Sequence, residues 1–250
     1  PKKFSQKLSK PIDIFQDVKL IAYPAIKDDE LVLNNQNSTI TSLPNLAGLS
    51  KTLDGDKNTG VTFPEGDLFT FDIGAKDVFT ARSLTIQTTD VPMKATVLFQ
   101  TKSKDGVYRT IKDFEIDRSN PSLNVGFTPY APVVLSFPAT TSTNFRLVVN
   151  LEKPTGWFLA YGKGAKSGFS EITLSSSPRV ERYAEKTLAK MYSTPLPYWK
   201  EYQWETQAEV DNQTTVIDGS KVIDISQYLT ADGTLNWNVP AGDWVILRTE

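Results

Sequence analysis

Short runs of alternating apolar and polar residues dominate the chain between residues 18 and 174. Alternation is clearest at Leu84, Ile86 and Thr88, which take one position in two. A period of two is that of a β-strand with one buried face, and turn-forming Gly, Pro, Asn and Asp separate the runs. The predicted strands are 18–26, 68–73, 83–88, 95–102, 107–116, 133–137, 145–149, 157–161 and 169–174.

No helical pattern alternates with these strands, which favours antiparallel over parallel pairing. We therefore predict an all-β fold, a jelly-roll-like antiparallel β-sandwich with one amphipathic helix and a partial second group of strands. The expected domains are an N-terminal connecting segment (1–17), the sandwich (18–177), a helix and linker (178–214) and a partial second β domain (215–250).

One segment, 178–192, has a helical period instead. Ser177 is a suitable N-cap, Pro178 suits the first helical position, and Pro195 ends the pattern. The predicted apolar face, which we expect to pack on a neighbour rather than lie on a membrane, consists of Val180, Tyr183, Ala184, Leu188, Met191 and Tyr192.

The last stretch, 232–250, is interpreted as two strands of a hairpin. Asp232-Gly233 is a turn signal, and Trp237 and Trp244 are expected to form a cross-strand or core pair. The second strand continues to the last residue, so we expect this chain to be part of a longer polypeptide.

Composition removes several kinds of chemistry. The 250 residues include no Cys and no His, which excludes disulfides, thiolate metal sites and the usual general base of serine hydrolases. A net charge of -2 argues against nucleic acid or an anionic membrane as a partner. No phosphate-binding glycine motif is present.

The sharpest local motif is the Asp-Gly-Asp-x-x-Thr loop at 54–59. Asp54, Asp56 and Thr59 offer hard oxygen ligands suited to Ca²⁺, and Gly55 permits a tight turn. A plain turn without an ion explains the same residues equally well.

Exposed aromatic side chains stack on sugar rings, and three residues are candidates for such contacts: Trp157, Tyr161 and Tyr130. The alternative is that each packs in the core or a loop. A further aromatic cluster, Tyr198, Trp199, Tyr202 and Trp204, is expected to pack at a domain junction. The acidic residues lie in polar runs typical of solvated faces, so we predict no catalytic carboxylate pair; they include Asp28, Asp29, Glu30, Asp113, Glu115, Asp117, Glu181 and Glu185.

The segment 239–248, VPAGDWVILR, resembles part of glycoside hydrolase family 106, the alpha-L-rhamnosidases. The segment 15–24, FQDVKLIAYP, resembles the strand by which those enzymes enter a β-sandwich insert. The resemblance implies that the catalytic acids lie on a barrel that this chain does not contain. It also implies a periplasmic or extracellular location, although no signal peptide opens this sequence.

The order of motifs also resembles the galactose-binding-like, or discoidin-like, sandwich of many carbohydrate-binding modules. The matching pieces are the 54–59 loop and the segments 69–74, 99–108, 145–148 and 170–174. This resemblance implies a structural calcium held by Asp54, Asp56, Thr59 and Glu171. The ion would stabilise the loop and take part in no reaction.

Together these observations predict a non-catalytic β-sandwich module of a rhamnosidase-like enzyme. Its expected partners are the catalytic barrel of the same polypeptide and, at loop tips, glycan. The alternatives are an independent carbohydrate-binding or adhesion module and a self-contained hydrolase that uses two of its own carboxylates.

Overall fold

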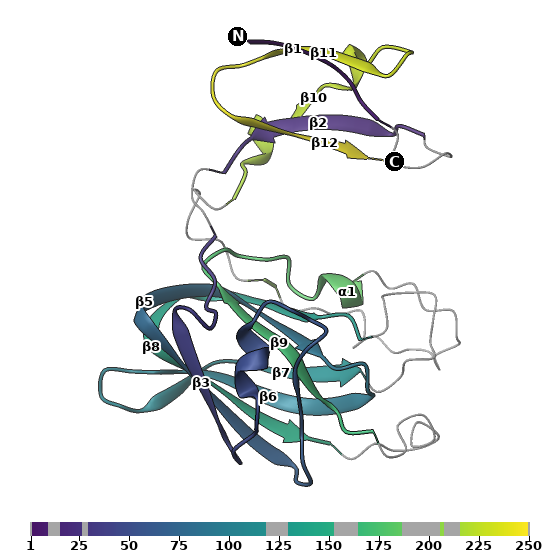
Figure 1. The fold of residues 1–250 in the computed structure, drawn as a ribbon. Coiled ribbons are helices and arrows are strands. Elements are labelled where there is room, and N and C mark those ends of the chain that lie inside the picture. The colour runs from purple at the N-terminus through teal and green to yellow at the C-terminus, as the bar shows by residue number, and fades with distance from the viewer. Residues whose placement is uncertain are drawn as a thin grey trace. The chain divides into compact units, whose positions relative to one another are not determined.

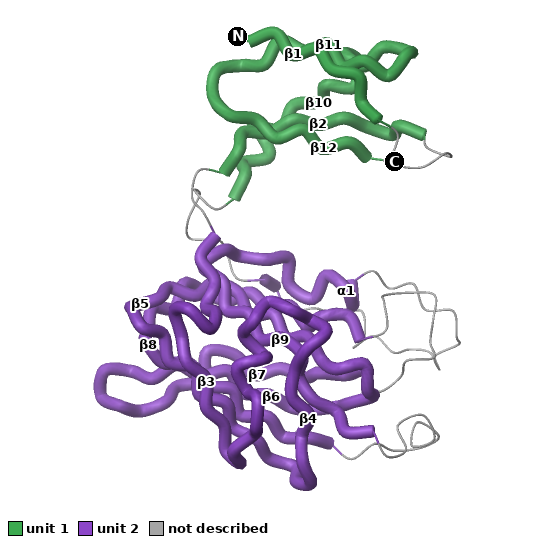
Figure 2. The backbone as a smooth tube through the Cα atoms, viewed as in Figure 1, with its two compact units in different colours: residues 1–29, 212–250 green, residues 30–211 purple. Residues whose placement is uncertain are grey.

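The computed structural model describes residues 2–9, 16–26, 30–118, 130–152, 165–186, 206–207 and 216–249. The chain divides into two compact units (Figure 2). One unit, here called the sandwich, spans residues 30–211, and the other, here called the strand group, combines residues 1–29 with residues 212–250.

The sandwich is built from antiparallel strands that follow one another along the chain (Figure 1). Their order across the sheet is β4-β9-β5-β8-β6-β7, and β3 pairs with β5. The strands are β3 (Ser38–Leu43), β4 (Val61–Thr62), β5 (Leu68–Thr88), β6 (Met93–Lys102), β7 (Tyr108–Arg118), β8 (Val133–Leu151) and β9 (Gly168–Ser175).

Two long bent strands connect the two layers of the sandwich. The first part of β5 pairs with β3 and with the end of β8, whereas its second part pairs with β9 and with the start of β8. Register shifts between Gly74 and Phe79 and between Ala81 and Ser83 mark the bend, as bulges commonly do. The predicted strands 68–73 and 83–88 are therefore one strand, and so are 133–137 and 145–149.

The core lies between these layers and is rich in phenylalanine. Phe71 of one layer lies 5.5 Å from Phe169 of the other, and Phe99 lies 5.1 Å from Phe137, both measured between ring centroids. Alternate residues along the strands point into this core, because successive side chains of a strand face opposite sides. The predicted fold class, a jelly-roll-like antiparallel β-sandwich, is confirmed.

Gly168 allows the short strand β4 to lie against β9. A Cβ atom at this position would lie 1.9 Å from the backbone oxygen of Val61, so no other residue fits without moving the backbone. The neighbouring amide of Phe63 donates to the Ser167 carbonyl at 2.8 Å and continues the pairing.

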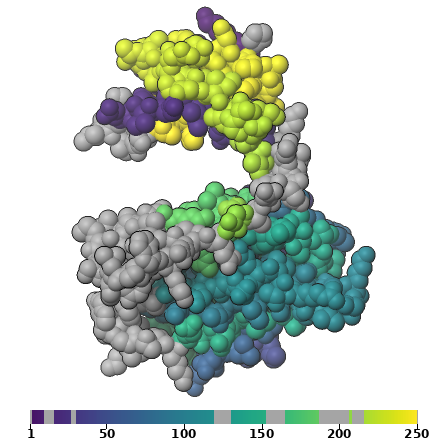
Figure 3. All heavy atoms as spheres, turned by 180° about the vertical axis from the view of Figure 1, so that it is seen from behind, coloured from purple at the N-terminus to yellow at the C-terminus, as the bar shows by residue number. Residues whose placement is uncertain are grey.

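The strand group contains two small sheets drawn from both ends of the sequence. In Figure 3 its purple N-terminal atoms and yellow C-terminal atoms lie side by side. β1 (Lys2–Lys7) pairs with β11 (Thr234–Val239), and β2 (Lys19–Pro24) lies between β10 (Ile223–Asp224) and β12 (Trp244–Thr249). The short 3-10 helix Gly219–Lys221 precedes β10, and a second one, Ser226–Tyr228, lies between β10 and β11. The buried residues of the strand group are Leu20, Ala22, Ile225, Leu235 and Trp237.

Two expectations about this part of the chain require correction. The segment 18–26 forms a strand as predicted, but it pairs with β10 and β12 and so belongs to the strand group instead of the sandwich. The two strands within 232–250 are present, but they do not form a hairpin, because β11 pairs with β1 and β12 pairs with β2. Trp237 and Trp244 do meet in the core, with ring centroids 5.6 Å apart and nearly perpendicular planes.

The predicted helix begins later than expected, at Tyr183 instead of residue 178. α1 spans Tyr183–Lys186, and Arg182 before it has a φ of 48°, a left-handed conformation that a continuous helix cannot contain. Of the expected apolar face, Ala184 is buried, whereas Val180 and Tyr183 are 65% and 48% exposed. Residues 188, 191 and 192 lie outside the described residues. No helix within the described ranges is long and apolar enough to cross a membrane.

Candidate functional site

The Asp-Gly-Asp loop follows the 3-10 helix η1 (Leu49–Leu53) and is closed by its own side chains. The Asp56 amide donates to Oδ1 of Asp54 at 2.8 Å, and the Thr59 hydroxyl donates to Oδ2 of Asp54 at 2.8 Å. Gly55 between the two acids has a φ of 81°, which glycine adopts without strain. These contacts give the loop the turn that the sequence indicates.

Asp56 faces donors on the other side of the same loop. Its Oδ1 accepts the backbone amide of Asn58 at 2.9 Å and the Asn58 side-chain amide at 2.8 Å. These hydrogen bonds lower the pKa of Asp56 and keep the carboxylate charged. Asp54 and Asp56 therefore place two anionic groups within one short turn.

Glu171 of β9 reaches this loop from 116 residues away in the sequence. Its Oε2 accepts the Gly55 amide at 3.3 Å. Burial, together with the negative charges of Asp54 and Asp56, raises the pKa of Glu171 to about 7, although the Gly55 amide acts in the opposite direction. The structure thus brings together all four residues that the sequence resemblance implied: Asp54, Asp56, Thr59 and Glu171.

The chemistry of this set fits a hard cation, since carboxylate and hydroxyl oxygens are the ligands that Ca²⁺ prefers. Among the described residues, however, no three His, Cys, Asp or Glu side chains converge closely enough to hold a metal by themselves. Backbone carbonyls and Thr59 would have to complete the coordination.

Of the three predicted sugar-contacting residues, only Tyr130 lies in the described ranges. It is half-buried, has a φ of 57°, and its carbonyl accepts the Gln87 side-chain amide at 2.6 Å. Burial and the nearby charge of Asp90 raise the pKa of its hydroxyl. Trp157 and Tyr161, and the aromatic cluster at 198–204, lie outside the described residues.

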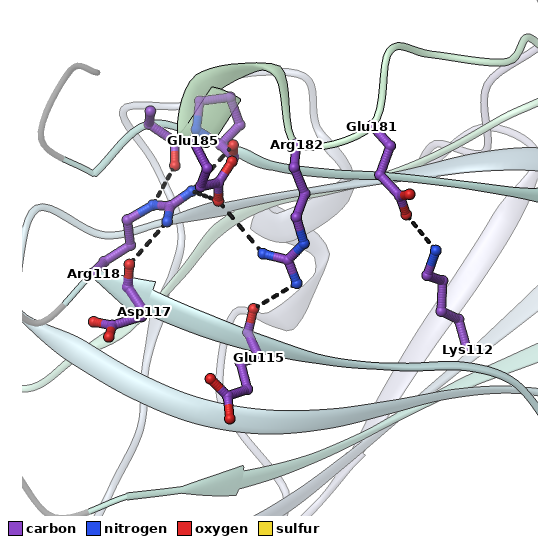
Figure 4. A network of polar contacts seen from close by, with 9 residues as sticks. Lys112, Glu115, Asp117, Arg118, Glu181, Arg182 and Glu185 are labelled. Carbon is purple, nitrogen blue, oxygen red and sulfur yellow. Dashed lines mark hydrogen bonds and ion pairs between the residues drawn. The ribbon is translucent and has the colours of Figure 1, made fainter. Parts of the chain in front are cut away.

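A polar network that the sequence did not reveal holds the 179–186 segment on the sandwich (Figure 4). The Arg118 side chain, only 2% exposed, donates to the carbonyl of Ala131 at 2.7 Å and to Oε1 of Glu185 at 2.8 Å. Lys112 pairs with Glu181, and Arg182 lies 3.6 Å from Glu185 and donates to the Glu115 carbonyl.

This network corrects the expectation of solvation for Glu181 and Glu185, whereas Glu30, Asp113, Glu115 and Asp117 are exposed as predicted. Glu181 is 5% exposed and Glu185 is half-buried, and each is paired with a cation from β7. Buried carboxylates require such partners, because an unpaired charge is costly to remove from water. Lys112 and Arg118 lie on β7, which corresponds to the predicted strand 107–116, but only the fold places the acids opposite them.

A second cluster missed by sequence lies on the outer face of the sandwich. Arg146 donates from Nε and Nη2 to the two carboxylate oxygens of Asp72, at 2.7 and 3.0 Å, and its guanidinium lies 3.6 Å from the ring centroid of Tyr108. The Tyr108 hydroxyl also donates to Asp72 at 2.9 Å. Burial acts to raise the pKa of Asp72, but the hydrogen bonds from Arg146 and Tyr108 outweigh it and lower the pKa.

Comparison with known proteins places this fold in a family. The family model described as alpha-L-rhamnosidase, glycoside hydrolase family 106, matches residues 2–250. The solved rhamnosidase of Novosphingobium sp. PP1Y is 21% identical, with a TM-score of 0.51, over 98% of this chain and 19% of its own. No curated protein matches the chain.

Solved carbohydrate-binding modules of family 32 are also among the similar structures. The module of Clostridium perfringens NanJ, determined with galactose, is 11% identical with a TM-score of 0.42, over 59% of this chain and 99% of its own. Another Clostridium perfringens module, determined with GalNAc-beta-1,3-galactose, is 15% identical with a TM-score of 0.39, over 58% and 99%.

The fold and the family match define a β-sandwich region of a carbohydrate-active enzyme family. The chain belongs to glycoside hydrolase family 106, the alpha-L-rhamnosidases, as its sequence resemblance indicated. It spans about a fifth of the length of the solved rhamnosidase that it matches.

Proposed function

We propose that this chain is a non-catalytic part of an alpha-L-rhamnosidase and supports the catalytic barrel of the same polypeptide. The family match across residues 2–250 carries the proposal. The solved rhamnosidase chain is far longer than this one, which leaves room in such a protein for a separate catalytic domain. A periplasmic or extracellular location is part of the same proposal.

The ion pairs of three acidic residues support a non-catalytic role for those residues. A glycosidase needs two carboxyl groups facing one sugar bond, roughly 5 to 9.5 Å apart, with one of them able to donate a proton. Here Glu181, Glu185 and Asp72 are neutralised by Lys112, Arg118 and Arg146 respectively. A carboxylate held by a cation is poorly suited to proton donation near neutral pH.

The calcium loop belongs to this proposal as a structural element. Asp54, Asp56, Thr59 and Glu171 would hold Ca²⁺ and fix the loop to β9. If so, EDTA lowers the melting temperature of the wild-type chain, and Asp56→Ala abolishes the difference between EDTA and calcium. If neither EDTA nor calcium changes the melting temperature of the wild-type chain, the loop is a plain turn without an ion. Asp105→Ala, which alters a different exposed loop, is the matched control.

Glycan contact at the loop tips is the last part of the proposal, through Tyr130, Trp157 and Tyr161. The residues are tested on a glycan array with single alanine variants that keep the wild-type melting temperature. Binding that disappears in Trp157→Ala or Tyr161→Ala supports the contact, and absence of binding by the wild-type chain across the array removes this part.

The central experiment compares residues 1–250 with the full-length gene product. Each is assayed with an aryl alpha-L-rhamnoside, and circular dichroism confirms that each is folded. We expect hydrolysis by the full-length product and none by residues 1–250. Hydrolysis by residues 1–250 alone would instead establish a self-contained hydrolase, and glycan binding without hydrolysis by either protein would establish an independent binding module.

A further inference from the structure

The three-stranded sheet of the strand group has one face buried in the core and one face that is partly exposed. In the paired register, Ala22 lies opposite Ile246 and Leu20 opposite Arg248. Leu20 and Ala22 are buried, and Ile246 packs against the same core. Side chains alternate across a strand, so the residues between them point to the other face.

That other face, here called the outer face, has an apolar part bordered by Lys19, Thr249 and Asp224, of which Lys19 and Asp224 form an ion pair at 3.1 Å. Ile21 is paired with Leu247, and Tyr23 is paired with Val245, so the four side chains form two adjacent cross-strand pairs. Val245 and Leu247 are 39% and 45% exposed, while Ile21 and Tyr23 are partly buried. An antiparallel sheet that faces water normally presents polar residues on that side, and contiguous apolar patches mark interaction surfaces.

The strand that carries most of this exposed surface is also an edge strand. β12 pairs with β2 on one side, and the order β10-β2-β12 places it at the edge of its sheet. Its sequence, WVILRT, contains no Pro and no Lys, two residues that commonly protect an edge from pairing with another chain, and its charged residue Arg248 pairs with Asp17. The exposed apolar residues Val245 and Leu247 and an edge of the described sheet therefore occur on the same strand.

The family match indicates which kind of partner could contact this surface. The match to the rhamnosidase family includes the strand group as well as the sandwich, and the solved rhamnosidase has about five times the length that this chain covers. A surface of this kind suits permanent contact within one polypeptide, because obligate interfaces are more apolar than transient ones.

We propose that Ile21, Tyr23, Val245 and Leu247 form the docking surface for an apolar face of another domain of the same, longer polypeptide. This inference rests on the proposed function in one respect, namely that the chain is part of a longer rhamnosidase. It goes beyond that function by assigning the contact to the outer face of the strand group.

Hydroxyl-radical labelling read by mass spectrometry tests the proposal without any measurement of activity. Full-length product and residues 1–250 are labelled in parallel, and the reporters are Tyr23 and Leu247. Both should be labelled severalfold less in the full-length product. Leu98, which is 41% exposed on β6 of the sandwich, is the internal control and should react equally in both.

A pair of matched substitutions gives an independent readout. Leu247→Asp should lower the melting temperature of the full-length product by several degrees but leave that of residues 1–250 nearly unchanged. Leu98→Asp should have the same small effect in both proteins. Equal effects of Leu247→Asp in the two proteins would overturn the proposal.

Three further outcomes would also overturn it. Equal protection of Tyr23 in both proteins would mean that this chain covers its own outer face. A dimer of residues 1–250 that Leu247→Asp dissociates in sedimentation would identify a second copy as the occupant. A natural product no longer than this chain would leave no domain to dock. A full-length product that protects Tyr23 but cleaves no rhamnoside would preserve the docking surface and refute the proposed activity.

Discussion

The sandwich and the strand group are both antiparallel β structures, but they bury their apolar residues to different extents. Within the described residues, the sandwich core contains 28 buried hydrophobic residues, whereas that of the strand group contains five. The outer face of the sandwich carries the Asp72–Arg146–Tyr108 cluster, whereas that of the strand group carries Val245 and Leu247. A small core gives little stability by itself, so the strand group depends more on what surrounds it.

The difference also appears in how the strands find their partners. Every strand of the sandwich pairs with another from the continuous segment 38–175, whereas β1 and β2 pair with strands more than 190 residues further along the chain. The sandwich is therefore specified within one segment, and the strand group is specified only by the two ends together. Four substitutions or conditions test this contrast.

The largest effect is expected from a cavity in the sandwich core. Phe71→Ala removes a fully buried ring that contacts Phe63 and Phe169, and should reduce the free energy of unfolding of the sandwich by about 3–5 kcal/mol. Hydrogen exchange should show the loss in β5 and β9 with no change in β2 and β11. Leu235→Ala is the reciprocal control. Joint loss of protection in both units would show that they unfold as one.

Removal of Arg118 should have the next largest effect. Arg118→Met leaves the Glu185 carboxylate half-buried beside a single, more distant cation, and should cost about 3 kcal/mol. Calorimetry of both single variants and the double variant with Glu185→Met measures the coupling. The double variant should recover most of the stability, since an apolar pair replaces a buried ion pair at little cost. Additive losses would contradict the pairing.

A smaller effect is expected from pH in the presence of EDTA. The pKa of Glu171 is raised from 4.5 to about 7 in the folded state, so the folded chain binds more protons than the unfolded chain between these values. Stability of the sandwich should therefore fall as pH rises from 4.5 to 7, by on the order of 1 kcal/mol after allowance for solvent screening. Chemical denaturation across this range measures the slope. Glu171→Gln should flatten it, and an unchanged slope in that variant would exclude Glu171 as the source.

The smallest effect is expected on the polar outer face of the sandwich. Arg146→Lys keeps the charge but loses the two-point contact with Asp72 and the flat stacking on Tyr108. The expected cost is about 0.5–1 kcal/mol, because the group is partly exposed. Urea denaturation measures it, with Arg109→Lys at an exposed ion pair as the control. An equal loss in the control would remove any special role for this cluster.

Sequence periodicity could predict most of the strands in the sandwich. Alternation at Leu84, Ile86 and Val97 matches their complete burial, because one face of each strand lies in the core. It could not show that 68–73 and 83–88 are one bent strand, since residues 75–78 between them have no alternating apolar pattern. β1, with the sequence KKFSQK, was missed for a different reason: its pairing with β11 is decided more than 200 residues away.

The candidate site divides in the same way. The turn at Asp54–Thr59 follows from local residue types, whereas the position of Glu171 beside Gly55 comes from the packing of β9 against the loop and was implied only by family resemblance. The Arg118–Glu185 pair could not be predicted, because Arg182 interrupts the expected helix and redirects the chain that carries Glu185. The residue types of the turn could be recognised from the sequence, whereas the distant residues that contact them could not.

Placement of the sandwich between the two halves of the strand group has a consequence for biosynthesis. The ribosome synthesises β1 and β2 before any of the strands that pair with them. Lys2 can pair with Val239 only after the whole sandwich has been synthesised. At a typical elongation rate this interval is on the order of tens of seconds, long enough for the sandwich to fold first. During that time the nascent N-terminal strands have unpaired edges, and chaperones that bind extended apolar segments would meet Leu20 to Tyr23 before β12 does.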